Sequence, residues 1–231
     1  GGKIFFQLQH PGRQQHSGMI GTMRTLDRIG TVWPGVWKRF NAAMEASPPG
    51  EEKPGRRATL APSAVPLQYG DTPIKNQPTR AVTVKEIHKI TGLFGDAALR
   101  ARKAGADGVE IHAAHGYFLS SFLSPYTNRR TDEYGGSLAD RARIIGEVIA
   151  DIRKKCGGAF PIIVRLNVDE FYRDIDMPGV GLTLDEGVEF AKLTERFGAD
   201  ALDVSCGTYE TLNHLMEPLK YEPGWRAYLG Q

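Results

Sequence analysis

The sequence predicts an α/β fold built on an all-parallel sheet, and three observations point to it. From about residue 81 onward, short apolar runs of strand type alternate with longer amphipathic runs of helical period. The run at 160–166 is nearly continuous in apolar residues, as in a strand of a parallel sheet that is buried on both faces. Helices of this length between strands are typical of the right-handed crossovers that join parallel strands. The runs of strand type are residues 3–8, 108–112, 160–166 and 201–205.

Three helices are expected between these strands. They begin at Thr83, Ser137 and Thr183, and Glu86 and Glu186 follow the two threonines at the spacing of a capping box. The apolar residues of each helix recur at helical spacing and predict its buried face. They are Ile87, Ile90, Phe94, Ala97, Ala98 and Ala101 in the first helix, Leu138, Ile144, Ile145, Val148, Ile149 and Ile152 in the second, and Val188, Ala191 and Phe197 in the third.

A closed (β/α)8 barrel of the TIM type fits these elements better than an open, doubly wound sheet. No G-x-G-x-x-G fingerprint follows any strand, which weakens the dinucleotide-binding form of the open sheet. In a barrel the active site lies where the strands end. Polar side chains gather at the expected strand ends: Gln7, His10, His112, His115, Arg165 and Ser205.

The composition of the chain argues against several classes of function. The 231 residues are 41% hydrophobic with a net charge of +2, and basic residues gather in no single stretch, so nucleic acid is not an expected partner. No apolar run is long enough to cross a membrane, and the two cysteines form neither a disulfide framework nor a metal motif. These features favour a cytoplasmic protein. We expect one domain over residues 1–231, with a long Gly- and Pro-rich loop excursion over about residues 11–80.

The segment from His112 to Tyr117 carries the densest group of reactive side chains. Two imidazoles three positions apart, just beyond a strand, can converge on one point and donate hydrogen bonds to a carbonyl oxygen. The phenol of Tyr117 adds a proton donor. Two other interpretations stay open: these residues satisfy backbone groups in a loop, or His112 and His115 ligate a metal.

Arg165 and Gln7 are the other candidate site residues. A guanidinium inside an apolar strand requires a carboxylate or an anionic ligand, so Arg165 forms either a structural ion pair or part of a binding site. Gln7, at the end of the first strand, can both donate and accept, as the edge of a heterocycle requires. Cys206 has no visible base and is expected to be a structural thiol. Residues 128–137 have the composition of a charged loop before a helix cap.

The chain resembles the old yellow enzyme family of NADH:flavin oxidoreductases across most of its length. The resemblance rests on six segments: QLQHPGR at 7–13, APS at 61–63, DGVEIHAAHGY at 107–117, FLSP at 122–125, NRRTDEYGGSLADR at 128–141, and VRL at 164–166. It implies a (β/α)8 barrel that binds FMN at the carboxyl ends of its strands and is recharged by NADH or NADPH. It also implies an α,β-unsaturated carbonyl or enoate as the small-molecule substrate.

The resemblance also implies roles for the candidate residues. Gln7 would bond the pyrimidine edge of the flavin, and Arg165 would lie by flavin N1 and O2. His112 and His115 would bind the substrate oxygen, and Tyr117 would protonate the alkene carbon opposite the hydride.

Segments DVSCGTYET at 203–211 and GWR at 224–226 look more like the multidomain branch that includes 2-enoate reductases and bile-acid-inducible oxidoreductases. Members of that branch carry an iron–sulfur cluster after the barrel, but its cysteine motif is absent from these residues.

By motif order, we expect the chain to cover strands three to six of the barrel and to be an internal piece of a longer product. Four strands leave open edges, which invite pairing with another chain, so a homo-oligomer is one expectation. Two alternatives to an FMN-dependent ene-reductase remain: another phosphate-binding barrel enzyme, and a catalytically silent fragment that serves in folding or interaction. The sequence does not distinguish NADH from NADPH or name the physiological alkene.

Overall fold

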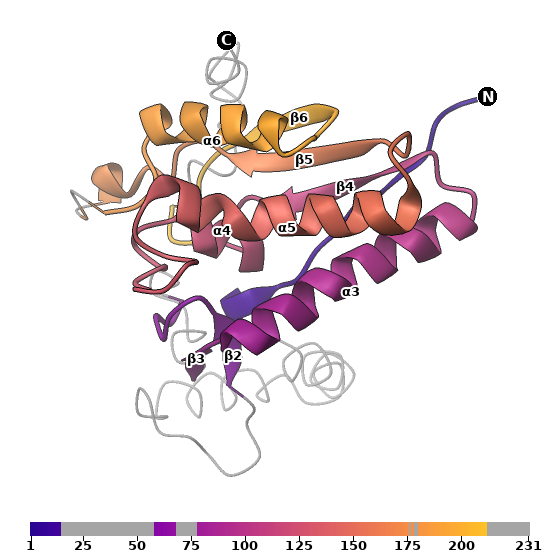
Figure 1. Cartoon of the computed structure of the whole chain (residues 1–231). Coiled ribbons are helices and arrows are strands. Elements are labelled where there is room, and N and C mark those ends of the chain that lie inside the picture. The colour runs from indigo at the N-terminus through magenta and orange to yellow at the C-terminus, as the bar shows by residue number, and fades with distance from the viewer. Residues whose placement is uncertain (15–57, 68–77, 176, 178–179, 212–231) are drawn as a thin grey trace, which may run out of the picture.

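A four-stranded parallel sheet forms the centre of the chain, as the sequence predicts (Figure 1). The computed structural model describes residues 1–14, 58–67, 78–175, 177 and 180–211. The sheet runs in the order β1-β4-β5-β6. Its strands are β1 (Phe5–Leu8), β4 (Gly108–Ala113), β5 (Ile162–Asn167) and β6 (Ala201–Ser205).

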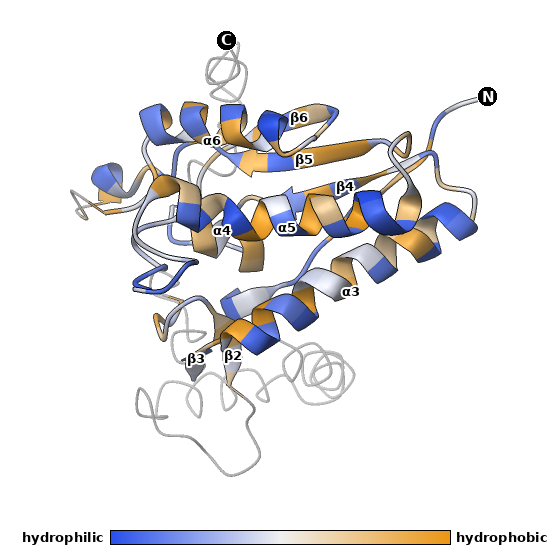
Figure 2. Ribbon diagram, viewed as in Figure 1, coloured by the Kyte–Doolittle hydropathy of each residue, from blue (hydrophilic) through white to orange (hydrophobic). Residues whose placement is uncertain are grey.

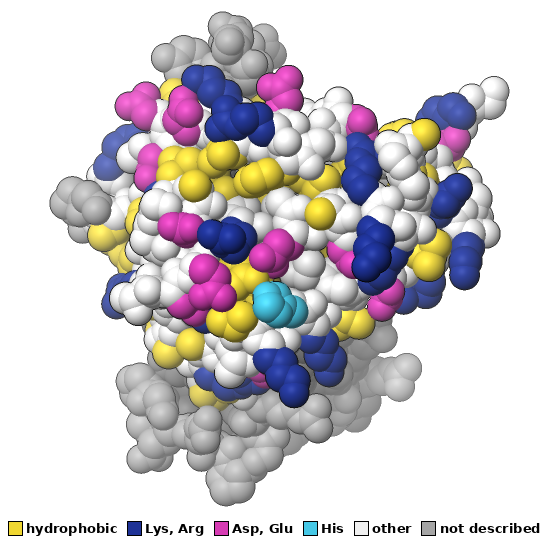
Figure 3. Space-filling view, in the orientation of Figure 1, with side chains coloured by type: hydrophobic (Ala, Val, Ile, Leu, Met, Phe, Trp, Pro, Cys, Tyr) yellow, Lys and Arg dark blue, Asp and Glu magenta, His cyan; other side chains and the backbone are white. Residues whose placement is uncertain are grey.

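Three helices cover one face of this sheet (Figures 1 and 2). They are α3 (Val84–Lys103), α5 (Leu138–Cys156) and α6 (Leu184–Arg196). The capping box of Thr83 and Glu86 is present, and the Ser137 side chain accepts a hydrogen bond from the Asp140 amide, so both predicted helix starts are confirmed. The apolar stripes of α3 and α5 pack with the strands into one core. The outer side of the helices carries acidic and basic side chains interspersed, with a band of apolar side chains between α5 and α6 (Figure 3).

Two details of the third helix differ from the prediction. Thr183 is its N-cap residue, but its side chain makes no capping hydrogen bond, and the Glu186 carboxylate binds Arg141 of α5. Val188, expected in the core, is 44% exposed. It lines a groove of about 490 Å³ beside β6, together with Leu202 and Val204. Within the described residues β6 is an outer strand, so no further element covers Val188.

Shorter elements complete the described fold. They are the 3-10 helices η1 (Gly12–Gln14) and η2 (Tyr172–Ile175), the helix α4 (Phe118–Leu123), and the strands β2 (Thr59–Ala61) and β3 (Thr79–Ala81), which pair in parallel as a second sheet. Strand β2 lies within the predicted loop excursion of about residues 11–80 and β3 lies at its end, and most of the excursion lies outside the described residues. Among described helices, none combines the length and apolarity needed to cross a membrane.

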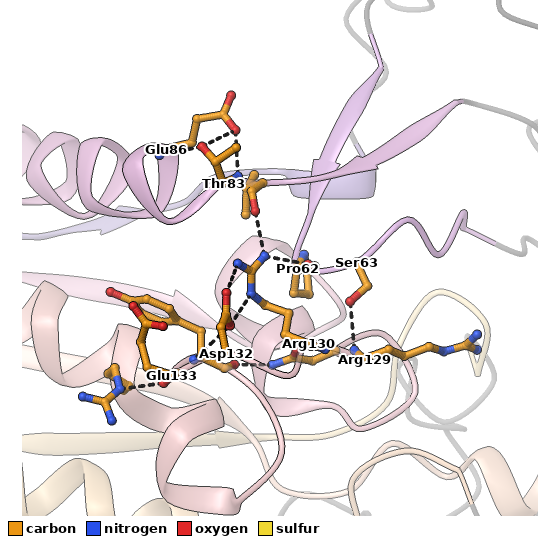
Figure 4. Close-up of polar contacts among 12 residues, drawn as sticks. Pro62, Ser63, Thr83, Glu86, Arg129, Arg130, Asp132 and Glu133 are labelled. Atoms are coloured by element: carbon orange, nitrogen blue, oxygen red, sulfur yellow. Dashed lines mark hydrogen bonds and ion pairs between the residues drawn. The ribbon is translucent and has the colours of Figure 1, made fainter.

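Arg130 joins the small sheet to the rest of the fold (Figure 4). Its Nη1 donates to the carbonyl oxygens of Pro62 (3.0 Å) and Val82 (2.6 Å), which follow β2 and β3. Its Nε donates to Asp132 at 2.9 Å, and the guanidinium also forms an ion pair with that carboxylate. The segment that the sequence indicated only as a charged loop is therefore a structural joint.

We expect Arg130→Met to lower the free energy of unfolding by about 2–4 kcal/mol, because it leaves two carbonyls and a carboxylate without their donor. The measurement is urea unfolding. Arg129→Met is the matched control, since the neighbouring Arg129 side chain is exposed and points away from this joint (Figure 4). Equal losses in the two variants would contradict the role given to Arg130.

Candidate active site

The two faces of the sheet differ in chemistry. Alternate residues of β4 and β5, including Val109, Ile111, Val164 and Leu166, are buried in the core beneath the helices. Successive side chains of a strand point to opposite faces, so the residues between them project from the other face. The register pairs Gln7 with Glu110, His112 with Arg165, and Arg165 with Asp203. These five residues form a polar row that crosses the four strands and steps from Glu110 to His112 along β4.

Direct contacts tie the polar row together at its two ends. The Gln7 amide donates to the Glu110 carboxylate. The Arg165 Nε lies 3.2 Å from Asp203 Oδ2, which supplies the carboxylate that a guanidinium in an apolar strand requires. Sequence reasoning missed Glu110 and Asp203. The signal that could have found them is the alternation of side chains along a strand. Glu110 lies two positions before His112, and Asp203 lies two positions before Ser205, so each shares a face of the sheet with a predicted residue.

His112 is held as a neutral hydrogen-bond donor. Its Nδ1 accepts a hydrogen bond from the Ala114 amide at 3.2 Å, so the ring proton of the neutral form lies on Nε2. Burial, together with the nearby positive charge of Arg165, lowers the pKa of His112 to about 4. The imidazole is therefore uncharged at pH 7 and has one N–H to offer.

A tight turn after β4 gathers the next two candidate residues against His112. His115 and Gly116 both have left-handed backbones, with φ of 61° and 73°. This conformation is uncommon for histidine, and such strained residues cluster at functional sites. The rings of His115 and Tyr117 lie 5.0 Å and 4.9 Å from that of His112, both edge-on. The sequence-predicted trio is therefore one cluster.

Ser205, the last residue of β6, and Tyr209, which follows that strand, complete this cluster. The Ser205 hydroxyl lies 2.6 Å from His115 Nε2, and the Tyr209 hydroxyl lies 3.0 Å from the Tyr117 hydroxyl. Ser205 is one of the predicted strand-end residues. Tyr209 was missed, because 92 positions separate it from Tyr117 and nothing in its local sequence marks it. Together these contacts bring the ends of β4 and β6 to the same place.

The donor set suits the edge of a flavin ring. Gln7 can donate and accept, Arg165 only donates, and neutral His112 donates one N–H, which matches a heterocycle with carbonyl oxygens and ring nitrogens. The Arg165 guanidinium carries donors besides the Nε that faces Asp203, so it can also donate to a ring oxygen or nitrogen. The parts of the chain that the structure describes contain no cluster of three His, Cys, Asp or Glu suited to a metal. Cys156 and Cys206 are buried and are not joined by a disulfide.

The comparisons with known proteins agree with a flavin-dependent oxidoreductase class. The sequence profile of the NADH:flavin oxidoreductase / NADH oxidase family matches residues 36–228. An NADH oxidase of Thermoanaerobacter brockii is 38% identical over all of this chain and 29% of its own length. A cinnamate reductase of Clostridium sporogenes is 36% identical over 73% of this chain and 26% of its own. The chain belongs to the NADH:flavin oxidoreductase / NADH oxidase family, in which old yellow enzyme-like proteins are found.

A solved structure supports the fold. The structure of morphinone reductase in complex with tetrahydroNAD matches 89% of this chain with a TM-score of 0.58 and 28% identity, and the match covers 49% of that protein. The fold is thus part of a TIM barrel, as predicted. The chain spans less than a third of the length of the NADH oxidase and the cinnamate reductase that it matches.

Proposed function

We propose that this chain is part of an FMN-dependent oxidoreductase domain that reduces the C=C bond of an α,β-unsaturated carbonyl or enoate, with NADH or NADPH as electron donor. The observation that carries the proposal is the cluster of His112, His115 and Tyr117 beside Arg165 at the carboxyl ends of the strands. Relatives named NADH oxidase and cinnamate reductase support the electron donor and the substrate class.

In this proposal Gln7 and Arg165 hold the flavin ring. The amide of Gln7 would meet the pyrimidine edge, and the guanidinium of Arg165 would lie by N1 and O2, where its charge favours negative charge on the ring. When bound, FMN supplies the hydride chemistry, taking a hydride from the nicotinamide and passing it to the alkene in a separate half-reaction. Asp203 and Glu110 orient the two side chains by the contacts described above.

His112 and His115 would bind the oxygen of the electron-withdrawing group. Negative charge grows on that oxygen as the alkene accepts a hydride, so a donor fixed there stabilises the transition state more than the ground state. The Nε2–H of His112 is already oriented by the Ala114 amide, and His115 is oriented by Ser205. The Tyr117 phenol then gives its proton to the second alkene carbon.

The first test is the visible absorbance of the purified protein after incubation with FMN, followed by denaturation and identification of the released flavin. We expect one FMN per chain. A chain that stays colourless would overturn the proposal for this chain and favour the catalytically silent alternative, in which its role is folding or interaction.

Binding of a phenol, followed by the change in flavin absorbance, then tests the oxygen site. We expect His112→Ala to weaken phenol binding about 10- to 100-fold, because a hydrogen bond to a charged oxygen is lost. His88→Ala is the matched control, since His88 lies on α3 and bonds Tyr134, away from the cluster. Unchanged affinity in His112→Ala would remove this residue from the site.

A further inference from the structure

A buried ion pair joins the loops that follow the two outer strands of the sheet. Arg13 lies in η1 after β1, and Glu210 lies after β6. The Arg13 Nη2 is 2.6 Å from Glu210 Oε1, and the two side chains are 0% and 2% exposed. The pair therefore spans the carboxyl edge of the sheet, over the ends of β4 and β5.

The local backbone is built to turn Arg13 inward. Gly12 has a φ of 59°, and a Cβ at this position would lie 2.9 Å from the Cα of Phe118. Only glycine allows η1 to pack this closely on α4. The Arg13 Nη1 also donates to the Pro66 carbonyl at 3.2 Å, and the adjacent Gln14 donates to the His115 carbonyl at 2.7 Å.

This ion pair is a poor source of stability. Burial removes both charges from water, and neither oxygen of Glu210 makes an aligned hydrogen bond within the described residues. Buried pairs with incomplete hydrogen bonding recover little of their desolvation cost, and their best-attested use is to specify one arrangement. The arrangement specified here is that of the segment holding Glu210, in which the preceding residue is Tyr209.

We infer that the Arg13–Glu210 ion pair positions Tyr209 so that its phenol supports Tyr117 as a proton donor. The inference rests on the proposed role of Tyr117. The two hydroxyls lie 3.0 Å apart, and their rings meet edge-on at 5.9 Å. When the O–H bond of Tyr117 breaks and a C–H bond forms on the substrate, the remaining phenolate accepts a hydrogen bond from Tyr209. Water then returns the proton to Tyr117. Tyr209, Arg13 and Glu210 are thus positioning residues.

The test uses the FMN-incubated protein and two readouts. The first is the ¹³Cζ resonance of Tyr117 in tyrosine-labelled protein, assigned by its loss in Tyr117→Phe; it requires no turnover. The variants are Tyr209→Phe and Glu210→Gln. Glu186→Gln is the matched control, because it also removes the carboxylate partner of a buried arginine, Arg141, but lies in α6.

We expect the Tyr117 resonance to move in Tyr209→Phe and in Glu210→Gln and to stay in place in Glu186→Gln. An unmoved resonance in Tyr209→Phe overturns the contact between the phenols. Movement in Tyr209→Phe with none in Glu210→Gln overturns positioning by the ion pair. Should Glu210→Gln fail to fold, Glu210→Asp keeps the charge but withdraws the carboxylate by one methylene, and the same shift is expected to be smaller.

The second readout separates the half-reactions. We expect each single variant to slow alkene reduction about 3- to 10-fold, as for loss of one hydrogen bond, with flavin reduction unchanged. The double variant should be no slower than the slower single variant, because both changes remove the same contact. If the rate losses of the two single variants multiply in the double variant, the inference is overturned, while the proposed function stands. Absence of alkene reduction in the unmodified protein would instead count against the proposed function, and the resonance would still test the contact.

Discussion

Tyr117→Phe is expected to slow alkene reduction about 10²- to 10⁴-fold while leaving reduction of the flavin by the nicotinamide nearly unchanged. The proposed proton donor acts only after hydride transfer to the alkene, so only that half-reaction loses it. The ring of Tyr117 lies 4.9 Å from His112 at the start of α4, and phenylalanine keeps the ring packing. Rapid-mixing kinetics of the two half-reactions, each followed by flavin absorbance, measure the effect.

The matched control is Tyr134→Phe. The Tyr134 hydroxyl is as well bonded as that of Tyr117, but to Glu147 at 2.8 Å and His88 at 2.9 Å, on the helices rather than at the strand ends. We expect this variant to change neither half-reaction. A comparable slowing of both half-reactions in Tyr117→Phe would show that Tyr117 supports the flavin or the fold and does not donate the proton.

Local signals in the sequence were sufficient for most of the fold. The capping box at Thr83 and the cap at Ser137 are contacts between residues three positions apart, and both form as predicted. Glu186 shows where local reasoning fails. Its spacing from Thr183 is equally good for a capping box, but the buried guanidinium of Arg141 competes for the same carboxylate. A charged partner 45 positions away outweighs a local amide, and the sequence pattern does not reveal it.

The candidate site likewise contains residues that local sequence predicts and residues that only the tertiary fold brings together. His112, His115 and Tyr117 lie within six positions, so one strand end and one turn suffice to gather them. Tyr209 and Glu210 reach the same place only through the register of four parallel strands. Their side chains carry no periodic signal, and the contacts with Tyr117 and Arg13 depend on the tertiary fold.

Glu170 is the buried acid with the clearest consequence for stability. Burial raises its pKa to about 7, although hydrogen bonds from Ser124 (2.6 Å) and the Leu182 amide (2.7 Å) to Oε2 act in the opposite direction. Glu210 raises the pKa further and Arg13 lowers it. Between pH 4.5 and about 7 the folded state therefore keeps a proton on Glu170 that the unfolded chain, in which the pKa of this carboxyl is 4.5, has lost. This stabilising contribution is complete below pH 4.5 and is lost as the pH rises through about 7.

Glu170→Gln removes this loss, because the amide oxygen can accept the same two hydrogen bonds without ionising. We expect the free energy of unfolding of the variant, minus that of the unmodified protein, to increase by about 3 kcal/mol between pH 4.5 and pH 8. The difference cancels the opposite contribution of His112, whose lowered pKa makes stability rise with pH up to about 6.5 in both proteins. Urea unfolding across this pH range is the measurement.

Glu189→Gln, in an exposed ion pair with Lys192, is the control and should keep the pH profile of the unmodified protein. Parallel profiles for Glu170→Gln and the unmodified protein would mean that Glu170 is ionised in the fold at all these pH values. In that case Arg13 would have to compensate both Glu170 and Glu210, and the ion pair would be shared between two carboxylates.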